Sequence, residues 1–160
     1  MKKTFSIVCL IISFVSITYS QNTNAIGLRF GGSDGFSTEV SFQHYVGGPN
    51  RLEIDLGFID AGWYDGFKGT LMYHWVKNID GGLNWYLGAG GSLGAWDIDD
   101  DKPGNDGNHD DGVFLDANAQ LGIEYNFTIP LQLSLDARPE FGLINDDFDF
   151  GYGLGIRFTF

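Results

Sequence analysis

One acidic segment, residues 97–111, holds the side chains best suited to bind a metal ion. Calcium takes several oxygen ligands from carboxylates and carbonyls that flexible loops supply. The spacing departs from an EF-hand loop, because no glycine follows Asp101 and no glutamate closes the segment. Two interpretations therefore stay open: a loosely bound Ca²⁺, or a solvated acidic loop without any cofactor. The candidate ligands for the first are Asp97, Asp99, Asp101 and Asp106.

The three histidines are the candidates for acid–base catalysis, which requires a base within reach of a nucleophile or of an oriented water molecule. His44 and His74 fall near one end of the elements that carry them. His109 lies at the opposite end, in the acidic segment, with no serine close in sequence. The glycine-rich stretches 31–35 and 88–94 do not open helices, as a phosphate-binding loop requires. We therefore predict no catalytic residues and no enzymatic activity.

Eight segments with alternating apolar and polar side chains position these residues, and each is closed by Gly, Asn, Asp or Pro. A period of two is the pattern of a strand with two unlike faces. An even number of antiparallel strands can close into a barrel that leaves no unpaired edge. We therefore predict an all-β fold, an eight-stranded antiparallel up-and-down barrel. Its strands are expected at residues 26–31, 36–43, 51–58, 67–76, 83–95, 113–124, 131–138 and 152–160.

The amino-terminal end of the sequence predicts a cleavable signal peptide. Lys2 and Lys3 precede the short apolar run Ile7–Val15, and Thr18 and Ser20 suit a cleavage site after residue 20. A membrane-spanning helix would need about 20 apolar residues, more than this run provides. We therefore expect a signal peptide at 1–20 and one domain at 21–160.

The composition of residues 21–160 restricts the classes of partner. The only cysteine, Cys9, lies in the signal peptide, so no disulfide can stabilise the domain. Without Lys2 and Lys3, seven basic residues stand against 21 acidic ones, a formal charge of −14. Binding to a nucleic-acid backbone requires a basic face, so nucleic acid is excluded as a partner.

The polar face of the segments decides between two kinds of barrel. A soluble, lipocalin-like carrier of an apolar ligand would turn its apolar face inward. A transmembrane barrel turns that face to lipid and fills its narrow lumen with polar side chains. Because buried charges must be paired, we predict an internal ion-pair network around Arg29, Arg138 and Arg157. Its expected carboxylates are Glu39, Glu53, Asp55, Asp116, Glu124, Asp136 and Glu140.

Aromatic positions and connection lengths favour the transmembrane barrel, with the chain starting in the periplasm. Periplasmic turns are short and outer loops longer in such proteins, and aromatic girdles mark both membrane interfaces. The connections 46–50, 78–82 and 126–130 are short, whereas the outer ones include 59–66, 96–112 and 144–148. The expected periplasmic girdle is Phe42, Tyr73, Trp75, Trp85, Tyr125, Phe158 and Phe160, and the outer one is Phe30, Phe36, Phe58, Phe67, Phe141 and Tyr152.

The last segment, Gly151–Phe160, resembles the terminal strand of bacterial outer-membrane barrels, with alternating apolar residues and a final aromatic residue. With Asn50–Gly57, Ile123–Phe127 and Ile129–Asp136, it makes residues 21–160 similar to small OmpA-like outer-membrane barrel proteins of Bacteroidetes. The resemblance implies a location in the outer membrane and contact with its lipid and lipopolysaccharide. It also implies recognition of the strand ending at Phe160 by the barrel-assembly machinery. No domain follows the barrel here, unlike OmpA-type proteins, so peptidoglycan tethering is not expected.

These observations predict an integral outer-membrane protein with a closed polar lumen. Its expected role is structural, or recognition of surface components through acidic outer loops. Two alternatives stay open: an outer-membrane lipid-modifying enzyme and the soluble lipocalin-like carrier.

Overall fold

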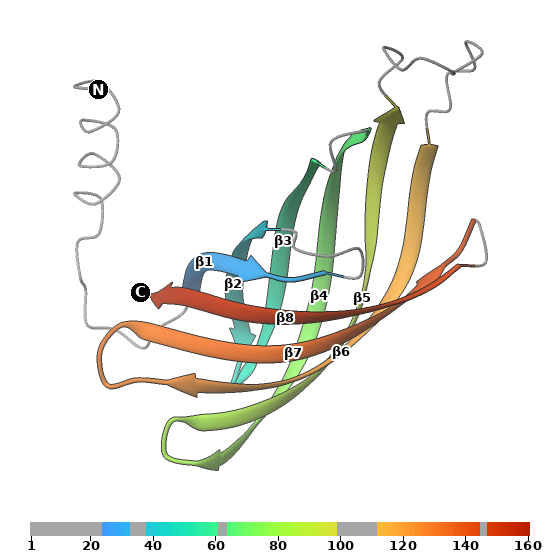
Figure 1. The fold of residues 1–160 in the computed structure, drawn as a ribbon. Coiled ribbons are helices and arrows are strands. Elements are labelled where there is room, and N and C mark those ends of the chain that lie inside the picture. Colours follow the sequence, from blue (N-terminus) through green and yellow to red (C-terminus); the bar gives the residue numbers. More distant parts are fainter. Residues whose placement is uncertain (1–23, 33–37, 61–63, 99–111, 145–146) are drawn as a thin grey trace, which may run out of the picture.

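Eight antiparallel strands close into one barrel in chain order (Figure 1). The fold is seen in a computed structural model that describes residues 24–32, 38–60, 64–98, 112–144 and 147–160. The predicted eight-stranded up-and-down barrel is therefore confirmed, while the predicted signal peptide lies outside the described residues. The strands are β1 (Asn24–Phe30), β2 (Thr38–Gly47), β3 (Asn50–Asp60), β4 (Tyr64–Asp80), β5 (Leu83–Ile98), β6 (Gly112–Asn126), β7 (Leu131–Gly142) and β8 (Phe148–Thr159).

The barrel closes where the first and last strands pair. β1 and β8 lie side by side in register, with Leu28 opposite Ile156. Beyond the ladder, the amide of Asn24 donates to the carbonyl of Phe160 at 3.1 Å, and the amide of Phe160 donates back at 2.9 Å. The last residue of the chain therefore takes part in closing the barrel through its backbone.

The strands are staggered, so they tilt relative to the barrel axis. The paired row that begins at Gln132 of β7 passes through β8 and then β1 to β6 and returns to β7 at Gly142, ten residues further along. Each step to the next strand thus climbs by little more than one residue. Such a stagger is what closes eight strands into a barrel whose interior is just filled by side chains.

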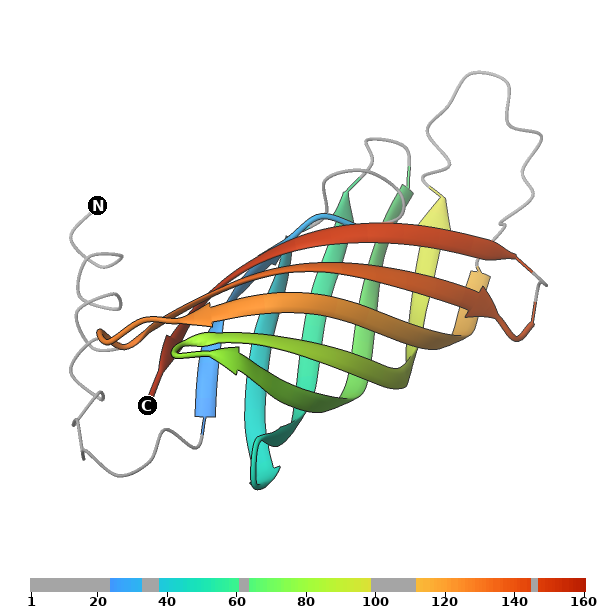
Figure 2. The same cartoon turned by 90° about the horizontal axis from the view of Figure 1, so that it is seen from below.

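Short turns occur at one end of the barrel, where the carboxyl terminus also lies (Figure 2). β2 and β3 are joined through Gly48 and Pro49, and β4 and β5 through Gly81 and Gly82. Gly48 (φ 57°) and Gly81 (φ 51°) adopt the left-handed conformation that tight hairpins require and that glycine tolerates best. Three of the four connections at the opposite end, residues 31–37, 99–111 and 143–147, are longer, as predicted, whereas the β3–β4 connection (61–63) is shorter than the β6–β7 turn (127–130).

The barrel wall is polar inside and apolar outside. Among the described residues, twenty polar or charged side chains are buried, against four hydrophobic ones. Large apolar side chains instead face outward, for example Phe58 (74 % exposed) and Leu121 (56 % exposed). The faces follow the predicted alternation, so the buried polar side chains occupy the lumen. The four buried hydrophobic residues are Ala25, Met72, Val76 and Tyr86.

Several strands extend further than the alternation predicted. β3 and β4 pair as far as Asp60 opposite Asp65, so the predicted 59–66 connection shortens to residues 61–63. β4 also continues to Asp80 and β5 to Ile98. Backbone hydrogen bonds prolong the ladders beyond the apolar belt, where the side-chain pattern no longer reports them.

Pro139 lies inside β7 and interrupts one ladder. The pairing of β6 with β7 passes from Asn118 opposite Glu140 directly to Leu121 opposite Ala137. Proline has no amide hydrogen to donate, which accounts for the missing pairs. The side of Pro139 that faces β8 stays in register, opposite Phe150.

Candidate functional site

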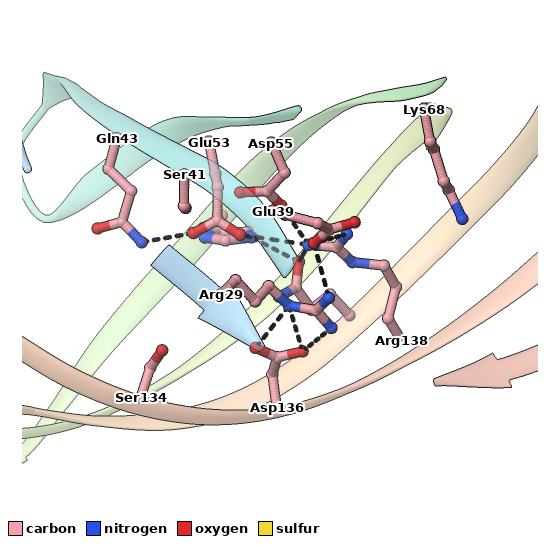
Figure 3. Close-up of polar contacts among 12 residues, drawn as sticks. Arg29, Glu39, Ser41, Gln43, Glu53, Asp55, Lys68, Ser134, Asp136 and Arg138 are labelled. Carbon is pink, nitrogen blue, oxygen red and sulfur yellow. Dashed lines mark hydrogen bonds and ion pairs between the residues drawn. The ribbon is translucent and has the colours of Figure 1, made fainter. Parts of the chain in front are cut away.

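Arginine and carboxylate side chains from opposite walls meet in the lumen (Figure 3). Arg29 of β1 lies between two acids: its Nη1 is 2.8 Å from Glu39 Oε2, and its Nη2 is 2.6 Å from Asp136 Oδ1. Arg29 Nε also donates to both oxygens of Asp136, at 3.2 Å. Arg29 and Asp136 are 107 residues apart in the chain, so the contact exists only because the barrel is closed.

Glu53 of β3 is the carboxylate with the most partners. Arg157 Nη2 donates to its Oε2 at 2.9 Å, Arg138 Nη2 donates to its Oε1 at 3.4 Å, and Gln43 Nε2 donates at 2.5 Å. Glu53 is fully buried. The remaining donors of Arg157 go to hydroxyl oxygens, at 2.9 Å from Ser41 and 2.8 Å from Ser134. Glu53 is thus the only carboxylate paired with Arg157 in the described part of the chain.

Arg138 of β7 links this cluster to further acids. Its Nη2 lies 2.5 Å from Asp55 Oδ2, and its Nη1 lies 3.5 Å from Glu39 Oε2. Buried charges are tolerated only when paired and hydrogen-bonded. The network predicted around Arg29, Arg138 and Arg157 is therefore confirmed, and it crosses the lumen from wall to wall.

A fourth arginine, Arg51, was not predicted as a member of the network. It is fully buried, with Nη2 2.5 Å from Glu124 Oε2 and Nε donating to His74 Nδ1 at 3.2 Å. Its guanidinium lies 4.9 Å from the ring centroid of Tyr86, and Tyr86 stacks on His74 at 4.6 Å. The inward parity of Arg51 in β3 was a sufficient signal, because it alternates with the same apolar residues as Glu53.

Besides Glu124, which pairs with Arg51, two predicted carboxylates make no contact with the predicted arginines among the described residues. Glu140 pairs with Lys68, and Asp116 accepts a hydrogen bond from Ser92 Oγ at 2.8 Å. The strand tilt lifts both acids toward the outer end of the lumen, above the level that the arginines reach. The prediction that Asp116 and Glu140 pair with the arginines was therefore wrong, although both lie on the predicted lumen side.

Glycines on the polar face make room for the large lumen side chains. A Cβ at Gly122 would overlap the ring of Tyr86, and one at Gly153 would overlap the guanidinium of Arg29. One at Gly88 would meet the ring of His74 at 2.7 Å. The interpretation of the glycine-rich 88–94 stretch as a strand that admits neighbouring side chains is confirmed.

The outer wall carries aromatic residues near both ends, as predicted. They form contacting pairs along or between neighbouring strands, with centroid distances typical of aromatic pairs. Phe36 lies outside the described residues. The pairs are Tyr73–Trp75, Tyr125–Phe127 and Phe158–Phe160 toward the short turns, and Phe141–Phe148 and Phe150–Tyr152 toward the opposite end.

The histidines are not arranged as a catalytic group in the described part of the chain. His44 is exposed on the outer face, as its parity predicted, with Nδ1 2.8 Å from Asn24 Oδ1. His74 is buried in the lumen, where its Nε2 lies 3.0 Å from Gln120 Oε1. His109 lies outside the described residues.

The predicted calcium ligands fall almost entirely outside the described residues. Only the backbone of Asp97 is described, in β5 opposite Asp65 of β4; Asp99, Asp101 and Asp106 are not. Across the described ranges, no three His, Cys, Asp or Glu side chains are grouped so that they could hold a metal ion. The calcium site stays a prediction.

Comparison with known proteins gives matches in structure alone. No protein-family model and no curated protein matches the chain. The N-terminal β-barrel domain of Pseudomonas aeruginosa OprF superposes with a TM-score of 0.70 at 21 % identity, covering 88 % of this chain and 98 % of that one. Neisserial surface protein A gives 0.60 at 16 % identity, covering 86 % and 94 %.

A third similar structure is Ail, the attachment invasion locus protein of Yersinia pestis. It matches with a TM-score of 0.54 at 13 % identity, covering 86 % of this chain and 96 % of Ail. A de novo designed transmembrane β-barrel matches at 0.59 and 12 % identity. At these identities the comparison concerns the fold, and residue roles do not transfer. The chain has the fold of the small eight-stranded barrels known from bacterial outer membranes.

Proposed function

We propose that this chain is an integral outer-membrane protein, exported through its signal peptide, with a closed lumen and a structural or surface-recognition role. The observation that carries the proposal is the inversion of the barrel wall, apolar outside and charged inside. A continuous apolar wall of this extent is unstable in water and marks a surface covered by lipid or by a partner. In the part of the chain that the structure describes, no helix is long and apolar enough to cross a membrane.

The polar lumen argues against the carrier. A carrier of an apolar ligand needs an apolar interior and a wall that water can wet. Here the interior is filled by paired arginines and carboxylates, and Leu93 and Leu121 are more than half exposed on the outside. Such a wall suits hydrocarbon chains and the acyl region of lipopolysaccharide.

Membrane fractionation and gel migration test the location. Expressed with its signal peptide in a Gram-negative host, the chain should sediment with the outer membrane. It should also migrate differently in SDS before and after boiling, because a closed barrel resists the detergent until heated. Recovery in the soluble periplasmic fraction, with no heat-dependent migration, would refute the proposed location.

The barrel-assembly machinery is the proposed partner of β8. Its outward residues Leu154 and Ile156 alternate with inward ones, and the exposed ring of Phe160 follows directly after it. An exposed apolar row on the last strand is a surface that an assembly factor can recognise before the barrel closes. Recognition by this partner can be tested separately from insertion into lipid, because assembly in cells requires the machinery whereas refolding into pure lipid vesicles does not.

The recognition role is assigned to residues 99–111 of the acidic segment, which lie between β5 and β6. A variant in which a short Gly-Ser link replaces this segment should still insert, because all eight strands remain. Its full-length control carries Asn at the six Asp positions of the segment, which removes charge at constant length. If the segment contacts envelope components, both variants should sensitise cells to bile salts relative to the wild type. Wild-type resistance in both would count against the role.

Calcium is a separate part of the proposal. Calorimetric titration of the refolded barrel at millimolar CaCl₂ should give heat for the wild type and none for the Asn control. If the wild type gave no heat, the calcium site would be rejected and the interpretation as a solvated acidic loop would remain. The enzyme alternative has its own test, since a change in the mass of lipid A on expression would support it.

A further inference from the structure

Five buried side chains in the outer half of the lumen carry polar atoms that make no hydrogen bond to the rest of the described chain. Both amide atoms of Asn118 and the hydroxyl of Thr70 are in this state, with only 4 % and 2 % of these residues exposed. The other atoms are Gln120 Nε2, Asp55 Oδ1, and Nε and Nη1 of Arg138, of which Nη1 still lies 3.5 Å from Glu39 Oε2. Native proteins satisfy nearly all such atoms, because a buried polar atom without a partner destabilises the fold.

The five side chains adjoin one another. Thr70 lies opposite Asp55 in the pairing of β3 with β4, and Arg138 Nη2 bonds both Asp55 Oδ2, at 2.5 Å, and Gln120 Oε1, at 3.3 Å. Figure 3 shows Asp55 and Arg138 reaching toward each other across the lumen. Asn118 precedes Gln120 by two residues on the same face of β6.

The stagger of the strands places three of these residues at one height in the barrel. Because each step to the next strand climbs by little more than one residue, Thr70, Asn118 and Arg138 lie within about one residue of the same level. Asp55 and Gln120 lie about one to two residues lower, so the unpartnered atoms line two adjoining layers of the lumen. The pairs Lys68–Glu140 and Ser92–Asp116 belong to the next level toward the outer end.

The chemistry of the unpartnered atoms identifies what can satisfy them. Asn118 Nδ2, Gln120 Nε2 and Arg138 Nε are donors, whereas Asn118 Oδ1 and Asp55 Oδ1 are acceptors, and the Thr70 hydroxyl is both. A metal cation would satisfy the oxygens but repel the N–H groups beside them. An anion would do the reverse. Water both donates and accepts, and buried water commonly makes about three hydrogen bonds to such groups.

We infer that Asp55, Thr70, Asn118, Gln120 and Arg138 form an internal hydration site that holds ordered water molecules at the outer end of the arginine network. The lumen is then closed in two different ways. Toward the short turns, the arginines pair directly with carboxylates, Arg51 with Glu124 and Arg157 with Glu53, and the amide oxygens of Gln43 and Gln132 are without a hydrogen bond within the described chain. In the hydration site, Arg138 bonds Asp55 and Gln120 through Nη2, and water molecules bond the atoms that these direct contacts leave over.

Nuclear magnetic resonance on the whole refolded barrel tests the site without any substitution. In perdeuterated detergent with a methyl-protonated Thr70, a cross-peak between the Thr70 methyl group and water is expected, although the residue is buried. The cross-peak should weaken in Asn118→Leu and persist in Ser134→Ala. Ser134 is a matched control, because it is equally buried and its hydroxyl already accepts from Arg157 at 2.8 Å. No cross-peak in the wild type would overturn the inference.

Unfolding measurements give a second test. The direction in which the unfolding equilibrium constant changes shows whether the Thr70 hydroxyl is bonded to water or buried without water. If water bonds the hydroxyl, Thr70→Val loses a hydrogen bond, and the unfolding equilibrium constant should rise about fivefold. If the hydroxyl is buried dry, the same substitution removes a burial penalty, and the constant should fall. An unchanged or lowered constant for Thr70→Val would therefore overturn the hydration site.

Discussion

Replacing Glu53 with glutamine removes one negative charge from the most connected carboxylate of the lumen while nearly preserving its shape. Arg157 would then keep the hydroxyls of Ser41 and Ser134 and one amide oxygen at position 53, but no carboxylate of the described chain. Arg138 would still have Asp55 at 2.5 Å and Glu39 at 3.5 Å. The change therefore leaves one guanidinium buried without a carboxylate.

The loss of folding free energy depends on which member of the Arg157–Glu53 pair remains buried without its partner. Removing one member of a buried ion pair costs about 3–5 kcal/mol, and the retained amide oxygen places Glu53→Gln near the lower value, about 3 kcal/mol. Arg157→Met removes the other member of the pair. Glu53 then still bonds Arg138 and Gln43, so we expect a smaller loss, about 1–2 kcal/mol. The double variant should lose less than the two single losses combined, because neither change then strands a charge.

Urea unfolding in phospholipid vesicles, followed through the four tryptophans of the chain, measures these free energies. Asp80→Asn is the control, since it removes a carboxylate that is exposed at the β4–β5 turn and should leave stability unchanged. The reasoning would be refuted if Glu53→Gln behaved like Asp80→Asn. It would also be refuted if Arg157→Met were the more damaging of the two single variants, because the asymmetry of partners would then have no energetic consequence.

Further predictions concern the glycines, the outer wall, the terminal strand and the lumen. Gly122→Val should lower the free energy of unfolding by about 1–3 kcal/mol, because the new side chain overlaps Tyr86, and adding Tyr86→Ala should restore part of it. Equal stability of Gly122→Val and the wild type would contradict the packing argument. Leu121→Arg on the lipid-facing wall should destabilise the barrel in vesicles by about 2–4 kcal/mol. Ile79→Arg, which lies beside a turn, should destabilise it clearly less, and similar losses for both variants would contradict a membrane centred on Leu121. Phe160→Ser keeps the backbone bonds to Asn24, so refolding into vesicles should be normal while the amount assembled in cells falls; normal assembly in cells would exclude recognition of this ring. Planar-bilayer recordings should show no stable channel, and steady conductance would disprove a closed lumen.

The strand content and the two faces could be predicted from the sequence. A residue's side of a strand depends only on its parity, so Arg29, Glu53 and Asp136 could be assigned to the lumen and Leu121 to the outer wall before any pairing was known. The number of strands followed from the turn residues between the alternating segments. Strand ends were less accurate, because the backbone ladders continue beyond the side-chain pattern, as at Asp60 and Asp80.

The partners inside the lumen could not be predicted from the sequence. Arg157 and Glu53 are 104 residues apart, and parity assigns them to the same interior without stating that they meet. Their contact depends on the curvature of the closed sheet and on its ten-residue stagger, which set the height of each side chain in the barrel. For that reason Glu140 and Asp116 pair away from the arginines, and Thr70 and Asn118 come to one level without a direct bond. Alternation is a local property of the chain, whereas height in the lumen belongs to the closed barrel as a whole.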